Sequence, residues 1–239
     1  KLNERSTAEV GLAADGDTIE NRNSNYQNDQ ALALPSMALG KYAKVDNKAL
    51  SAIAIGTGSG AYGQYSIGLG STVYAGGQQS IAIGSVAKSR GQNSIAMGLN
   101  AEAVGKDAMS VGALSNAREA GALAIGGNSD ARKMESIAFG RTAFANGTSG
   151  IAIGKAAKTG LAIDDKDKDV PDGQWTGTRT VAIGESAEAR RDQDIAIGYN
   201  SVTKAGDGVS IGSVAKTNGE NSIAIGSNAL VEVAENKRA

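Results

Sequence analysis

The stretch Asn93-Ser94-Ile95-Ala96-Met97-Gly98 contains the pattern that decides the fold: two large apolar residues flank a small one, and a glycine follows. The pattern occurs thirteen times in the 239-residue chain, and most of its glycines lie fourteen residues apart. A fixed period this short indicates that each repeat forms one structural coil and that the coils stack into a solenoid. The glycines of the pattern are Gly40, Gly56, Gly70, Gly84, Gly98, Gly112, Gly126, Gly140, Gly154, Gly184, Gly198, Gly212 and Gly226.

Two steps depart from the period and divide the chain into parts. The step from Gly154 to Gly184 is more than twice the usual spacing, which predicts an insertion near 161–179, and the step from Gly40 to Gly56 is slightly long. Residues 37–230 are expected to form the roll, and residues 1–36 to cap its first coil. Residues 231–239 are interpreted as the start of a neck or the end of a fragment, since neither end of the chain resembles a natural terminus.

Composition excludes several classes of function. The 24 basic and 25 acidic residues give a net charge of −1, so nothing favours nucleic acid or an anionic membrane as a partner. The chain has no Cys and no His, which removes disulfides, the commonest general base and the commonest metal ligand. We therefore expect neither catalysis nor a bound cofactor. No signal peptide or membrane-spanning apolar run is evident, so this chain is expected to be soluble.

Each repeat predicts two short strands. Counted from the motif glycine as position 0, positions −3 and −1 are large and apolar, and position −2 is only Ala, Ser or Gly. Such alternation is typical of a strand with −3 and −1 on one face. A second alternation at +3 to +5, as in Ala101-Glu102-Ala103, places small residues on one face and a charge on the other. Two strands and two turns per repeat predict an all-β, flattened parallel roll.

The first strand of each repeat almost lacks charge. Positions −4 to −1 contain no Lys, Arg or Glu in any copy, and the one Asp is Asp194. Both faces of this strand are therefore predicted to be buried, although one thin roll can cover only one of them, so the other predicts an interface with another chain. The pattern leaves open which face lines the roll. Interdigitation of large side chains with the small side chains at +3 and +5 favours the large residues inside and the Ala/Ser strip at the interface.

The repeat, also seen in Asn221-Ser222-Ile223-Ala224-Ile225-Gly226, resembles the head repeat of YadA-like trimeric autotransporter adhesins over about residues 37–230. The resemblance implies a left-handed parallel β-roll of three identical chains, although the residues alone do not decide between two chains and three. It also implies display on a bacterial cell surface, anchored in the outer membrane through regions absent from this chain. Its implied role in virulence is attachment to host cells and to matrix proteins of the collagen, fibronectin and laminin class.

The insertion holds the residues that differ most from the repeat. Asp165, Asp167 and Asp169 form a weak candidate metal site, because the glycine and glutamate of an EF-hand loop are missing. The only Trp of the chain, Trp175, is a candidate ligand contact, since loops on rigid scaffolds often bind and Trp is a common anchor. A solvated loop with no binding role is the simpler interpretation.

Other aromatic residues are also candidate contacts with matrix ligands. Tyr62, Tyr74 and Phe144 fall on predicted outer strands or turns, although scattered surface aromatics are normal. We expect binding to be distributed along the roll, because a repeating surface offers many weak and nearly equivalent sites. The alternative function is a polysaccharide-acting β-solenoid enzyme that uses a carboxylate pair. The repeat glycines expected to matter for structure include Gly56, Gly84, Gly98, Gly126, Gly154, Gly184, Gly198 and Gly226.

Overall fold

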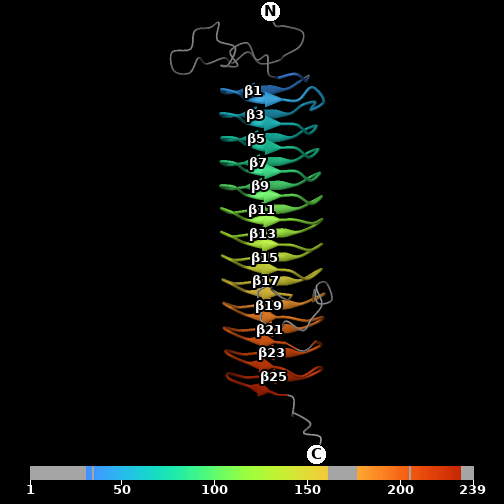
Figure 1. Cartoon of the computed structure of the whole chain (residues 1–239), viewed down its shortest axis with the longest axis vertical. Coiled ribbons are helices and arrows are strands. Elements are labelled where there is room, and N and C mark those ends of the chain that lie inside the picture. The colour runs from blue at the N-terminus through green and yellow to red at the C-terminus, as the bar shows by residue number, and fades with distance from the viewer. Residues whose placement is uncertain (1–30, 34, 161–176, 205, 233–239) are drawn as a thin grey trace, which may run out of the picture. The chain divides into compact units, whose positions relative to one another are not determined.

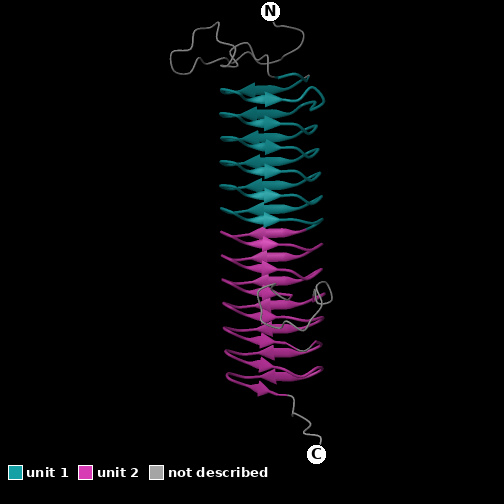
Figure 2. Ribbon diagram, viewed as in Figure 1, with its two compact units in different colours: residues 1–121 teal, residues 122–239 magenta. Residues whose placement is uncertain are grey.

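The computed structural model describes residues 31–33, 35–160, 177–204 and 206–232. The chain divides into two compact units, Lys1–Gly121 and Ala122–Ala239, coloured separately in Figure 2. Within each unit, three-residue strands with odd numbers alternate along the chain with two-residue strands with even numbers (Figure 1). The described residues contain no helix, so the prediction of an all-β roll is confirmed.

The first unit contains twelve strands in two parallel sheets, one of odd-numbered and one of even-numbered strands. The odd-numbered strands are β1 (Met37–Leu39), β3 (Ile53–Ile55), β5 (Ile67–Leu69), β7 (Ile81–Ile83), β9 (Ile95–Met97) and β11 (Met109–Val111). The even-numbered strands are β2 (Lys44–Val45), β4 (Gly60–Ala61), β6 (Tyr74–Ala75), β8 (Lys88–Ser89), β10 (Glu102–Ala103) and β12 (Asn116–Ala117).

The second unit repeats this arrangement with fourteen strands. Its odd-numbered strands are β13 (Leu123–Ile125), β15 (Ile137–Phe139), β17 (Ile151–Ile153), β19 (Val181–Ile183), β21 (Ile195–Ile197), β23 (Val209–Ile211) and β25 (Ile223–Ile225). Its even-numbered strands are β14 (Asp130–Ala131), β16 (Phe144–Ala145), β18 (Lys158–Thr159), β20 (Glu188–Ala189), β22 (Val202–Thr203), β24 (Lys216–Thr217) and β26 (Leu230–Val231).

Strands pair in a register that aligns equal positions of successive repeats. In the first unit Ala82 of β7 pairs with Ala96 of β9, and Lys88 of β8 pairs with Glu102 of β10. The register also holds in the second unit across the long step between motif glycines, because Ile151 of β17 pairs with Val181 of β19. One coil per repeat with parallel pairing is therefore confirmed.

Small side chains fill the space between the two sheets. Ala82 and Ala96 at position −2 are fully buried, and so are Ala87 at +3 and Ser89 at +5. The expectation that the large side chains at −3 and −1 line the roll is therefore wrong. Two sheets joined by tight turns leave room only for short side chains, mostly Ala and Ser with some Thr and Val, because interiors pack at crystal-like density. The large residues point outwards, and the Ala/Ser strip forms the interior.

The motif glycines allow successive coils to approach each other closely. Gly84 has φ of +130°, and a Cβ added there would lie 2.5 Å from the carbonyl oxygen of Gly98. A methyl group would thus be strained in conformation and would also collide with backbone. Gly226, in the last coil, has φ of +124°, but a Cβ there would meet only the side chain of Ala229, at 4.0 Å.

Turn positions +2 and −5 of the coils adopt the left-handed backbone conformation. Val86 has φ of +59° and Asn93 has φ of +56°. This conformation is unfavourable for a β-branched residue such as Val. It is held in place by pairing between coils, since the Val86 N–H donates to the Ser71 carbonyl at 2.9 Å. The stack of coils therefore imposes the turn conformation, whatever residue stands there.

Candidate functional site

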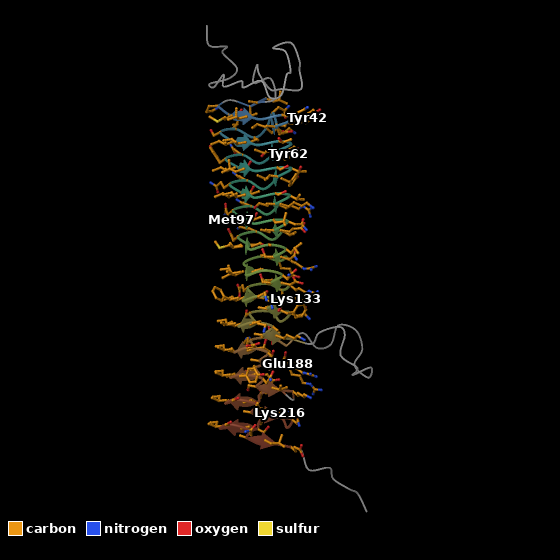
Figure 3. The ribbon with its side chains drawn as sticks, turned by 90° about the vertical axis from the view of Figure 1, so that its left-hand side faces the viewer. Tyr42, Tyr62, Met97, Lys133, Glu188 and Lys216 are labelled. Carbon is orange, nitrogen blue, oxygen red and sulfur yellow. The ribbon has the colours of Figure 1, made fainter. Side chains whose placement is uncertain are left out.

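The outer side of the odd-numbered strands is an apolar surface, here called the apolar face. It is formed by the residues at positions −3 and −1, such as Ile81 and Ile83, which are partly exposed. Met97 is 39% exposed and projects from one side of the first unit, whereas Tyr62 lies on the opposite side (Figure 3). No described residue at these positions is charged. A continuous exposed apolar strip of this kind marks a surface that associates with another molecule.

The outer side of the even-numbered strands, here called the polar face, carries the residues at positions +4 and +6. Arg90 pairs with Glu102 of the next coil at 2.6 Å, and Arg132 pairs with Asp130 of its own coil at 2.7 Å. Ion pairs at a surface contribute little to stability. The charged side chains of this face remain partly exposed, so the face is hydrated and accessible. The two outer faces of one roll therefore differ in chemistry.

Two of the aromatic residues singled out from the sequence come together on the polar face. The rings of Tyr62 and Tyr74, from neighbouring coils, stack with centroids 4.8 Å apart and an interplanar angle of 27°. Each ring occupies the space left by a glycine of its own coil, since a Cβ on Gly60 would collide with Tyr62 and one on Gly76 with Tyr74. This combination of tyrosine and glycine builds a paired aromatic patch with both rings partly exposed.

Phe144 does not join this pair. It belongs to the second unit, where the Arg132 guanidinium lies over its ring with the Cζ atom 4.4 Å from the centroid. Arg132 also holds Asp130, so the three side chains form one local cluster of an acid, a base and an aromatic ring.

A family model described as the YadA head domain repeat matches most of the roll. The matched residues are 48–71, 75–101, 103–129, 131–157, 176–201 and 205–229. The chain belongs to this family. The resemblance of its repeat to the heads of YadA-like adhesins is thereby confirmed, and the family is one of adhesin heads and not of enzymes.

Similarity to a solved structure is also found. The crystal structure of the collagen-binding domain of the Yersinia adhesin YadA is 24% identical to this chain, with a TM-score of 0.31. The match covers 79% of this chain and 73% of that chain. A search of curated proteins finds no match.

Asp194 is the one charged residue that the described part of this YadA head buries in its interior. Its Oδ1 accepts hydrogen bonds from the N–H groups of Gly206 at 3.0 Å and Gly208 at 3.2 Å. Its Oδ2 accepts another from the Arg191 N–H at 2.9 Å. Burial raises the pKa of this carboxyl, and the hydrogen bonds to backbone lower it by a smaller amount.

At the same position of another coil, Ser94 bonds in the opposite sense. Ser94 donates from its Oγ to the carbonyl oxygen of Gly91 at 2.7 Å, whereas Asp194 accepts from backbone N–H groups. Asp194 therefore secures the turn before β23 and belongs to the scaffold of the YadA head, not to a binding surface.

Several candidates fall outside the described residues, namely Trp175 and the weak metal set Asp165, Asp167 and Asp169. Among the residues that the structure does describe, no three acidic, His or Cys side chains group as a metal site would require. Nowhere in the described part of the chain is there a helix that could carry it across a membrane.

The sequence did not indicate a groove on the second unit of the YadA head. It runs over four coils, between the turn side chains at position +2 and the outward strand side chains at position +4, and its volume is about 410 Å³. Lys158, Glu188 and Lys216 line one side, and Ser186 and Asn200 line the other. The alternation alone identified the side chains at position +4 as outward. The side chains at position +2 share no residue type, so no signal marked them as neighbours.

Proposed function

We propose that this chain is the head of a bacterial surface adhesin that attaches to host cells and to extracellular matrix proteins of the collagen, fibronectin and laminin class. Membership in the YadA head family supports this role. The observation that carries it is the opposition of the apolar face and the polar face on each coil, because one face is suited to self-association and the other stays free for a ligand.

The partner for the apolar face is a second and a third copy of the same chain. A symmetric homo-oligomer covers the same surface on every copy, and this strip keeps the same apolar character in every repeat. The resemblance to trimeric adhesins favours three copies over two. Display on the cell surface, with an outer-membrane anchor in other regions of the protein, follows from the same resemblance.

The ligand surface is the polar face. Its repeating coils present many similar weak sites, and several copies of the chain multiply them, so avidity supplies the overall strength of binding. Within this face the Tyr62–Tyr74 patch is the strongest single contact candidate, because the two rings are already ordered against each other. Phe144 and Trp175 are weaker candidates, since the first is covered by Arg132 and the second lies outside the described residues.

Binding of the assembled protein to immobilised collagen, fibronectin and laminin tests this proposal. We expect the double variant Tyr62→Ala and Tyr74→Ala to weaken binding by about three- to tenfold, which is what the loss of an aromatic contact costs. Tyr199→Ala, at an exposed turn of the second unit, is the matched control and should bind normally. A folded assembly that binds none of the three proteins would contradict the proposal.

Catalysis is not part of the proposed function, and neither is a cofactor. Cleavage of a glycosidic bond needs two carboxyl groups facing each other across the substrate. On the described polar face Asp130, Glu102 and Glu188 each form an ion pair with an arginine. Turnover of a polysaccharide that is lost when one of these carboxylates is replaced would overturn this part of the proposal.

A further inference from the structure

We propose that the groove on the second unit binds an extended sulfated polysaccharide of the glycosaminoglycan class. The inference rests on the proposed adhesive function and adds a class of ligand that is not a protein. It is carried by the shape of the groove, by two lysines that form no ion pair with the described residues, and by hydroxyl and amide groups that form no hydrogen bond with them.

The groove is elongated and could hold an extended polymer along its length. It extends over β18, β20, β22 and β24, and strands of a sheet are spaced about 4.8 Å apart, so its ends lie about 14 Å apart. It is open to solvent and its turn side is lined by short side chains. A compact small molecule would remain mostly exposed here, whereas an extended chain could contact all four coils.

Among the described side chains that line the groove, positive charge exceeds negative charge. Glu188 pairs with Arg190 of its own coil at 3.0 Å, so its carboxylate is already neutralised. Lys158 and Lys216, at the two ends of the groove, form no ion pair with any described residue. An anionic ligand could therefore approach both ammonium groups without first breaking an ion pair with any residue that the structure describes.

Polar groups between the two lysines suit a sugar. The Ser186 hydroxyl and the Asn200 amide line the groove, and no hydrogen bond of either side chain is formed with the described residues. Hydroxyl and amide groups can donate to and accept from sugar hydroxyls and sulfate oxygens. Lys216 and Glu188 project from the same side of the second unit, as Figure 3 shows.

An acidic peptide fits the groove less well. The groove crosses the strands, and the strand N–H and carbonyl groups on its floor already bond between coils, as in Lys158 N–H to the Ala187 carbonyl at 2.8 Å. A peptide therefore finds no free strand edge to extend. Only side-chain groups remain for recognition, and a densely sulfated chain offers more charges per unit length for the two lysines.

Calorimetric titration of the assembled full chain with a heparin-derived octasaccharide tests the inference. We expect the double variant Lys158→Ala and Lys216→Ala to bind about tenfold more weakly, because two charge contacts are lost. Lys44→Ala with Lys88→Ala, at the same position +4 in the first unit, is the matched control and should change the affinity by less than about twofold. Binding should weaken steeply as salt is raised.

Three results would overturn the inference. These are no binding of the octasaccharide, equal losses in the groove and control variants, or equal binding of a chemically desulfated octasaccharide or a poly-glutamate peptide. Collagen, fibronectin and laminin are assayed on the same variants. Normal matrix binding by the groove variant separates a failure of this inference from a failure of the proposed function.

Discussion

The two sheets of the roll are alike on the inside and different on the outside. Ala82 of β7 and Ser89 of β8 are both fully buried and small, so the inner surfaces of the two sheets are interchangeable in character. On the outside, the partly exposed Ile81 of β7 contrasts with Lys88 of β8. The inward residues therefore specify the coil, and the outward residues decide what each surface binds.

The largest effect is expected when an inward residue of either sheet is enlarged, and this tests whether the two inner surfaces are equivalent. Ala96→Lys on β9 and Ala103→Lys on β10 should each destabilise the chain by at least about 3 kcal/mol, because a charge would enter a space that holds a methyl group. Urea denaturation followed by circular dichroism measures both. Lys88→Glu, on the outside of β8, is the control and should change the free energy of unfolding little. Tolerance of either lysine would show that the two inner surfaces are not equivalent.

A charge on the apolar face should affect assembly while the fold is retained. Ile81→Lys with Ile83→Lys places like charges where the proposed copies meet, and we expect self-association to weaken by more than about a hundredfold. Asn116→Lys adds a charge to the polar face of the same unit and should leave association unchanged. Sedimentation equilibrium reports the mass of each variant. If the isoleucine variant assembles like the parent, the apolar face is not the interface.

At Asp194 an inward position carries an ionisable side chain in place of a small neutral one, so its contribution to stability should depend on pH. Its raised pKa means that the folded state holds the proton more tightly than the unfolded state. Stability should then be greatest below the unfolded pKa of about 4 and should fall as pH rises through the folded pKa. Asp194→Ser should remove this fall, so the stability of the variant relative to the parent should rise over that window.

Urea denaturation at a series of pH values from about 3.5 to 7.5 measures the effect of Asp194. Ser94→Ala, at the equivalent position of another coil, controls for the loss of a buried hydrogen bond and should shift stability equally at every pH. Parallel pH profiles for the parent and Asp194→Ser would contradict the assigned direction of the pKa shift.

The smallest effect is expected for an ion pair on the polar face. Glu102→Gln removes the partner of Arg90, and since both side chains are partly exposed the change in stability should be below about 1 kcal/mol. Thermal denaturation measures it, with the partly exposed Lys133, as Lys133→Gln, for the control. A larger loss would mean that the polar face contributes to the scaffold as the inner residues do.

The repeat predicted the fold well because register follows directly from a fixed period. The period set Ala82 opposite Ala96, and the pairing is as expected. The orientation of the first strand was predicted wrongly, since alternation separates two faces without saying which is inside, and the distance between the sheets decides that. The space between the two sheets is wide enough for the side chains of Ala and Ser but too narrow for that of Ile.

The surface sites were only partly predictable. Tyr62 and Tyr74 were both selected as outward aromatics, but their stacking depends on side chains at +6 and +4 of neighbouring coils leaning toward each other over Gly60 and Gly76. The groove was missed because its turn side is built from dissimilar residues whose common feature is a backbone conformation, as in Asn200 with φ of +50°. Residue type alone carries little information about that conformation.

The column of motif glycines also bears on how such a chain can change its length during evolution. Within a unit, each motif glycine that is followed by another coil leaves room for the carbonyl group of the next motif glycine, as Gly84 does for Gly98, so successive coils make the same fit with each other. Whole fourteen-residue segments can then be duplicated or deleted by recombination without new compensating mutations. Losing or gaining a single residue within a strand would put every later glycine out of phase. Selection can therefore alter the number of coils far more easily than the design of any one of them.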